Sequence, residues 1–121
     1  MTKQAFFIPI RPASWNRIAT AHWRVYKEYK DALAQATWVA LKQAKIKPYA
    51  GQIRIEATAH WKDKRSRDVD NLFIKSVLDQ MVKEGIIKDD SLNYVLSVAY
   101  FGKTGSDKEG FEIILVPMSV L

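Results

Sequence analysis

The chain has 121 residues and a mass of 13.9 kDa, so we expect a single domain over residues 1–121 with no second hydrophobic core. The lack of cysteine excludes disulfide frameworks, thiolate zinc sites and cysteine nucleophiles, and the two histidines argue against an imidazole-based metal site. The net charge of +6 and the pI near 9.6 favour a polyanionic partner such as nucleic acid. Uninterrupted aliphatic runs reach only about four residues, so we expect no membrane span and a cytoplasmic protein.

The first half of the chain predicts a strand, a long helix and a second strand. Residues 5–10 are a short apolar run interrupted by proline, which is typical of an edge strand, and residues 12–17 follow as a loop. Between residues 23 and 44 apolar side chains recur every three or four positions, which predicts an amphipathic helix with Thr20 as a candidate N-cap. Residues 52–61 alternate apolar and polar side chains without exception, which predicts a strand with one buried face.

The second half predicts one more helix and two more strands. After a basic turn at residues 62–67, a helix is expected at residues 70–84, with Gly85 as the residue that ends it. Two β-rich runs, 93–101 and 111–116, predict a terminal antiparallel hairpin. The order β-α-β-α-β-β indicates an α/β (α+β) fold in which two helices cover a mixed four-stranded sheet, part of it parallel.

The charge is divided unevenly along the chain. Residues 1–67 hold 14 lysines and arginines against 4 acidic residues, whereas residues 68–121 hold 5 against 9. Aspartates are concentrated at the start of the acidic part: Asp68, Asp70, Asp79, Asp89 and Asp90. This acidic cluster is the unusual feature of an otherwise basic chain.

Asp68 and Asp70 stand between a predicted strand and a predicted helix. On extended backbone their side chains point to the same side, where two carboxylates repel each other unless a cation lies between them or one takes a proton. Carboxylate oxygens are the ligands that Mg²⁺ and Mn²⁺ prefer, so a metal site is one interpretation. Helix capping with compensation of the helix dipole is the alternative. A third carboxylate, from Asp89 or Asp90, would have to fold back over the sheet.

Lys75 is the candidate cation of this region. On a helical wheel Asn71, Lys75 and Asp79 border the buried face of the predicted helix. Lys75 is therefore placed to reach an anion held by the metal, or to pair with Asp79 four residues later. Both interpretations stay open.

The sequence argues against several other kinds of functional site. A calcium loop beginning at Asp68 would need glycine at its sixth position, where Phe73 stands. Phosphate-binding glycine loops, dinucleotide motifs and zincin motifs do not occur, so we expect no nucleotide cofactor. His60 is expected to be solvated or structural, and Trp15 is a candidate for stacking on nucleic acid.

The motif Arg67–Asn71 (RDVDN), followed by Lys75 and Asp89–Ser91, resembles the RusA family of Holliday junction resolvases. The loop over residues 12–16 is similar to that family's opening segment, and the resemblance extends over residues 6–116. It implies a homodimeric, Mg²⁺-dependent endodeoxyribonuclease, with Mn²⁺ as a substitute, that resolves four-way DNA junctions by paired nicks in recombination and repair. Such enzymes are often found in phages and prophages.

The resemblance also implies roles for particular residues. Asp68, Asp70 and Asp90 would be catalytic carboxylates and metal ligands, Asp89 a further ligand, and Lys75 the catalytic lysine. The family usually places this lysine four residues after the second aspartate, whereas Lys75 comes five residues after Asp70. A π-bulge or an altered helix start would absorb the extra residue.

The remaining expected contacts are with the DNA backbone, which is recognised by shape and charge rather than by base sequence. The residues expected to make them are Arg11, Asn16, Arg17, Arg24, Lys62, Lys64, Arg65, Arg67 and Asn71. Two alternatives stay open: an inactive DNA-binding module of the same fold, and a metal-dependent nuclease for other branched or single-stranded nucleic acid.

Overall fold

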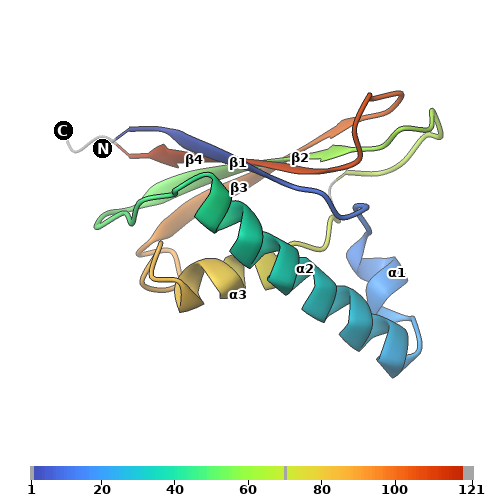
Figure 1. The fold of residues 1–121 in the computed structure, drawn as a ribbon, viewed down its shortest axis with the longest axis horizontal. Helices are drawn as coiled ribbons and strands as arrows, with labels where there is room; N and C mark the ends of the chain where they lie inside the picture. The colour runs from blue at the N-terminus through green and yellow to red at the C-terminus, as the bar shows by residue number, and fades with distance from the viewer. Residues whose placement is uncertain (1, 70, 119–121) are drawn as a thin grey trace.

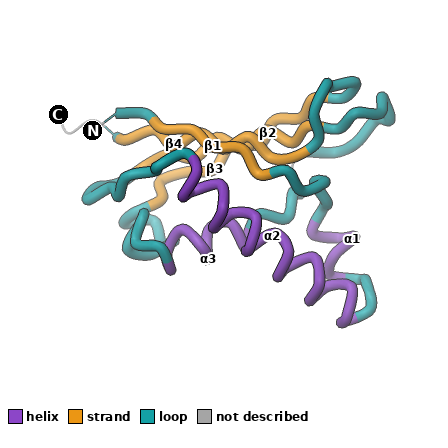
Figure 2. The backbone as a smooth tube through the Cα atoms, viewed as in Figure 1, coloured by secondary structure: helices purple, strands orange, loops and turns teal. Residues whose placement is uncertain are grey.

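The computed structural model describes residues 2–69 and 71–118, which form two layers (Figure 1). One layer is a four-stranded sheet, and the helices of the described part of the chain all lie on one side of it (Figure 2). In chain order the elements are β1 (Gln4–Ile8), α1 (Trp15–Ala19), α2 (Trp23–Gln43), β2 (Ile53–His60), α3 (Lys75–Lys83), β3 (Val95–Lys103) and β4 (Gly110–Pro117). The predicted α+β class is confirmed, with three helices in the described residues instead of two. None of these helices has the length and apolar character needed to cross a membrane.

The sheet is mixed and has the strand order β1-β4-β2-β3. β2 and β3 are parallel, whereas β4 is antiparallel to both β1 and β2. The predictions of a mixed sheet and of an edge position for the first strand are therefore confirmed. The predicted terminal hairpin is wrong, because β2 lies between β3 and β4.

The burial of the last two strands explains this order. β4 carries Phe111, Ile113 and Leu115, which are fully buried, so a central position with a partner strand on each side suits it. In β3 only Val95 is buried, a pattern that an edge strand tolerates. The crossover through α3 places β3 parallel to β2, and the chain then returns along the other side of β2.

The helix boundaries near the N-terminus differ from the predictions. Part of the expected loop at residues 12–17 forms the short helix α1, because the Ser14 side chain accepts a hydrogen bond from the Arg17 backbone N–H at 3.2 Å. The N-cap of α2 is His22 and not Thr20, whose hydroxyl instead donates to the Asn16 carbonyl at 2.7 Å.

The helix α3 begins at Lys75, five residues later than predicted. The segment before it is held by the N-terminal loop, since Trp15 N–H donates to Asn71 O at 2.7 Å and Phe73 N–H donates to Ala13 O at 2.8 Å. Leu72, Phe73 and Ile74 are consecutive buried residues, which non-helical backbone accommodates and one face of a helix does not. Gly85 ends α3 with a φ of +72°, as predicted.

Candidate functional site

Asp68 lies on the loop between β2 and α3 and is exposed to solvent. It contributes to two cavities that also share Ser14. One, of about 220 Å³, is lined by four arginines: Arg11, Arg17, Arg65 and Arg67. The other, of about 400 Å³, is completed by Asn16 and Asn71. The sequence-predicted ligand Asp70 lies outside the described residues.

An ion-pair cluster fixes the loop that leads to Asp68. Asp63 accepts two hydrogen bonds from the Arg67 guanidinium, at 2.5 and 2.9 Å, and one from Arg11 at 3.1 Å. Arg11 also donates to Glu109 at 2.7 Å. Arg67 stacks over the Trp61 ring at 4.7 Å, and the hydrogen bond from Arg67 is the main cause that holds the pKa of Asp63 well below its usual range. Arg11 and Arg67 are thus engaged within the protein.

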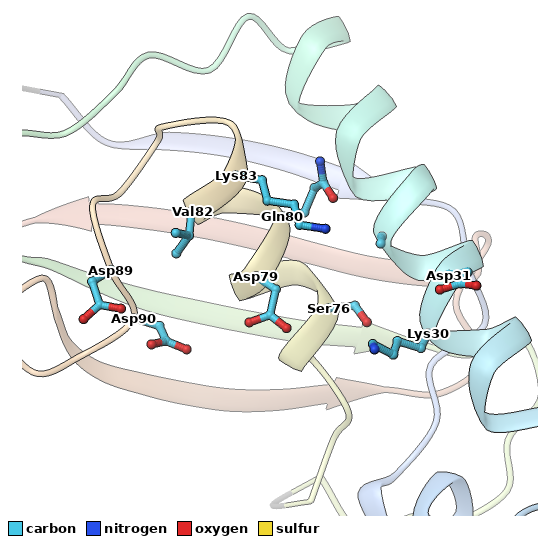
Figure 3. A pocket seen from close by; sticks show the side chains of 10 residues that line it. Lys30, Asp31, Ser76, Asp79, Gln80, Val82, Lys83, Asp89 and Asp90 are labelled. Carbon is cyan, nitrogen blue, oxygen red and sulfur yellow. The ribbon is translucent and has the colours of Figure 1, made fainter. Parts of the chain in front are cut away.

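Asp89 and Asp90 follow α3 and line a different cavity, of about 420 Å³ (Figure 3). Asp79 and Ser76 of α3 contribute to the same cavity, and Lys30 reaches into it from α2. The Ser76 hydroxyl is buried and has no hydrogen-bond partner among the described residues. Asp79, which the helical wheel placed beside the predicted catalytic lysine, therefore shares a cavity with Asp89 and Asp90.

Lys75 occupies the first turn of α3, with its ammonium group 3.6 Å from the Asp79 carboxylate. The predicted pairing at i, i+4 is therefore observed. Both side chains remain about half exposed, so the pair contributes little stability and leaves the ammonium group accessible.

The structure brings some of the predicted ligands together and not others. Asp89 and Asp90 share one cavity, while Asp68 lines the cavities around the arginines. Within residues 2–69 and 71–118, no three acidic or histidine side chains are close enough to hold a metal ion. Capping does not explain Asp68, because the N-cap of α3 is Ile74 and it has no side-chain hydrogen bond. The exposed carboxylates are oxygen donors of the type that fits Mg²⁺.

Most predicted DNA contacts lie on the surface. The exposed ones are Arg11, Asn16, Arg17, Arg24, Lys62, Lys64 and Arg65. Asn71 is half-buried, and Trp15, also partly buried, packs edge-on against Phe73 at 4.7 Å at the border of the core. His60 is buried and structural, lying 3.1 Å from Glu112 and 3.0 Å from Ser106.

Four further residues near the site were not predicted from the sequence: Asp63, Glu109, Lys30 and Ser76. Asp63 is the single acid in a run of cations, and its spacing of four residues from Arg67 was an available signal. Glu109 and Lys30 approach from distant parts of the chain, so no local pattern indicates them.

Comparison with known proteins supports the resemblance noted in the sequence. The chain is 34% identical over 84 residues to the crossover junction endodeoxyribonuclease RusA of Aquifex aeolicus (strain VF5). Over these residues the chain is similar to a RusA protein. The match covers 69% of this chain and 64% of the relative, so it spans somewhat less than two thirds of the relative's length. No protein-family model matches the chain.

The RusA resemblance includes one departure, the extra residue before Lys75, and Lys75 is the residue at which α3 begins. α3 is α-helical from Lys75 to Lys83, and residues 71–74 precede it in a non-helical conformation pinned to the N-terminal loop. Among the described residues α3 contains no π-helical turn.

Proposed function

We propose that the chain is a RusA-type endonuclease that cleaves four-way DNA junctions with the help of Mg²⁺ or Mn²⁺. The observation that carries this proposal is the similarity to a crossover junction endodeoxyribonuclease. The RDVDN motif at residues 67–71 supports it, because Asp68 of this motif is exposed on the loop after β2. As the resemblance to the RusA family implies, the protein would act as a homodimer whose two sites nick opposing strands.

Carboxylates on two loops would hold the metal: Asp68, Asp70, Asp89 and Asp90. When bound, a hard divalent ion supplies an activated water and neutralises charge on the scissile phosphate. Because Asp68 and Asp90 line different cavities in the structure, the two loops would have to close on the ion together with the DNA. Lys75, fixed at the start of α3, would offer its ammonium group to the developing negative charge or to the leaving oxygen.

The cavity beside Asp68 is suited to the DNA backbone. Arg17 and Arg65 line it and are exposed, and Lys64 is exposed on the same loop. Guanidinium groups bind phosphate through paired N–H donors, and neutralised phosphates release counterions. This contact gives affinity without base-sequence readout, which suits a substrate recognised by its branched shape.

Replacing Arg17, Lys64 and Arg65 together by alanine is expected to weaken binding to all DNA shapes. Three lost phosphate contacts would reduce the slope of log affinity against log salt by about 2 to 3. The slope is measured by fluorescence anisotropy with a four-way junction and a duplex over a range of salt concentrations. The control variant has alanine at Lys42, Lys45 and Lys47. It also loses three positive charges, but at the C-terminal end of α2 and in the turn that follows. Equal slopes for both triple variants would show that the Asp68 cavity is not a DNA footprint.

A substrate panel tests the proposed function. The protein is incubated with a four-way junction, a flap, single-stranded DNA, single-stranded RNA and duplex DNA, each with Mg²⁺ or with EDTA. We expect Mg²⁺-dependent cleavage of the four-way junction in preference to the others. Tight junction binding without cleavage would instead support the inactive binding module, and preference for another substrate would support the second alternative.

A further inference from the structure

We propose that Gly102 of β3 is a positioning residue for the catalytic loop. Because Gly102 has no side chain, Val69 of the RDVDN motif packs directly against it, and this contact fixes the aspartate beside Val69. The inference rests on the proposed function and deepens it. The resemblance to the RusA family gave roles to the aspartates of the motif but none to Val69 or Gly102.

The space next to Gly102 on the sheet is filled by Val69. Gly102 pairs with Ala59 of β2, which is fully buried on the face that the helices cover. Paired residues of neighbouring strands direct their side chains to the same face, so a side chain at position 102 would point to that face as well. A Cβ atom there would overlap the Val69 Cγ1 methyl group and lie 3.5 Å from the Trp61 ring. Val69 therefore occupies the place of the missing side chain.

This contact brings the loop after β2 back to the strand from which it departs. At the start of the loop, Trp61 donates its N–H to Lys103 O at 2.9 Å and accepts the Ser106 N–H at its carbonyl at 3.0 Å. The loop then runs beside the turn between β3 and β4 (Figure 1). At its end, Val69 contacts Gly102, the direct neighbour of Lys103. Both ends of the loop are thus held at the same end of β3.

The position of Val69 determines that of Asp68, which precedes it directly in the chain. Val69 is half-buried, whereas Asp68 is exposed and lines the cavities that Ser14 shares. Valine is branched at Cβ and has a stiff χ1, so a held valine side chain restricts its own backbone and the adjoining residue. Catalysis is sensitive to displacements of about 1 Å at a reacting group. A methyl group at position 102 would displace Val69 and, with it, Asp68.

Gly102→Ala distinguishes this role from that of an ordinary glycine in a strand. Glycine weakens a strand, so alanine at a position with free space would be tolerated or would stabilise the protein. At Gly102 we expect the turnover of the bound junction to fall by about tenfold or more, with junction affinity within about twofold of the wild type. Gly51→Ala is the matched control, because a Cβ atom there meets nothing within 4 Å, and it should retain wild-type turnover.

A second substitution tests whether the loss arises from the contact with Val69. Val69→Ala removes the methyl group that alanine at position 102 would overlap. The double variant Val69→Ala/Gly102→Ala is therefore expected to turn over the junction at least about threefold faster than Gly102→Ala alone, although Val69→Ala by itself lowers turnover. Losses that simply add in the double variant would overturn the inference. If Gly102→Ala does not fold, the double variant should fold, and a double variant that stays unfolded would also contradict the contact.

Nuclear magnetic resonance of the protein without DNA tests the inference independently of cleavage. The wild type should show a nuclear Overhauser effect between the Val69 methyl protons and the Gly102 α-protons. In Gly102→Ala the backbone order parameters of residues 67–69 should fall by about 0.2 or more, whereas those of β2 and of the Gly51→Ala protein should match the wild type.

Absence of this Overhauser effect, or unchanged order parameters in Gly102→Ala, would overturn the inference whatever the nuclease activity. Wild-type turnover by Gly102→Ala would overturn it as well. If the wild type cleaves no DNA but both spectroscopic results are obtained, the proposed function fails while the contact of Val69 with Gly102 stands.

Discussion

Asp68→Asn is expected to reduce Mg²⁺-dependent cleavage of a four-way junction by about 100-fold or more. The amide keeps the size of the side chain but removes a charged oxygen ligand, which weakens binding of a hard cation and the activation of water. Junction affinity in metal-free buffer should stay equal or become tighter, because a negative charge next to the DNA is lost. Cleavage and binding are measured on the same labelled junction.

The controls for Asp68→Asn separate the loss of a metal ligand from a general charge effect and from a loss of stability. Asp107→Asn makes the same charge change and should retain wild-type cleavage. Asp68 caps no helix, so the substitution should leave the unfolding midpoint within about 2 °C of the wild type. Near-normal cleavage by Asp68→Asn would remove this residue from the catalytic site.

Phe73→Ala is expected to lower the free energy of unfolding by about 3 to 5 kcal/mol. Phe73 is fully buried, and its ring meets Trp15 at 4.7 Å and Tyr29 at 5.9 Å between ring centres. The truncation leaves a cavity between the helices and the segment that leads into α3. Urea unfolding followed by circular dichroism measures the loss.

Two further variants calibrate the Phe73 result. Phe73→Leu keeps most of the apolar volume and should cost less than Phe73→Ala, so it gives a measurable value even if the alanine variant is largely unfolded. Leu92→Ala, at a position that is 72% exposed, should change stability by less than about 0.5 kcal/mol. A loss below about 1 kcal/mol for Phe73→Ala would contradict the packing described around this residue.

Phe73 also illustrates where sequence reasoning failed. Leu72, Phe73 and Ile74 follow an aspartate and precede a clear apolar helical pattern, so a helix starting at residue 70 was the natural prediction. The real start depends on hydrogen bonds that Ala13 O accepts and Trp15 N–H donates, and these residues lie about sixty positions away, so the local sequence gives no sign of them. The prediction of a terminal hairpin was wrong for a similar reason. The position of β2 between β3 and β4 is decided by tertiary packing and not by the local sequence.

Predictions held where local chemistry decides the outcome. The uninterrupted alternation of residues 52–61 gave the central strand β2 with its buried face, and Gly85 marked the end of α3 because a positive φ is required there. The RDVDN motif and the aspartates that follow it in the chain indicated a resemblance to the RusA family, which the comparison supports. The sequence did not indicate that Arg11 pairs with Asp63 and Glu109, because these residues meet only in the folded protein.

We expect Asp68 and Asp90, which line different cavities, to bind one metal ion. Electron paramagnetic resonance of Mn²⁺ measures this directly, with the wild type, Asp68→Asn and Asp90→Asn titrated under identical conditions. We expect one ion per chain in the wild type and a loss of affinity of about tenfold or more in each variant, since both would remove a ligand of the same ion. Wild-type Mn²⁺ affinity in either variant would contradict a shared site.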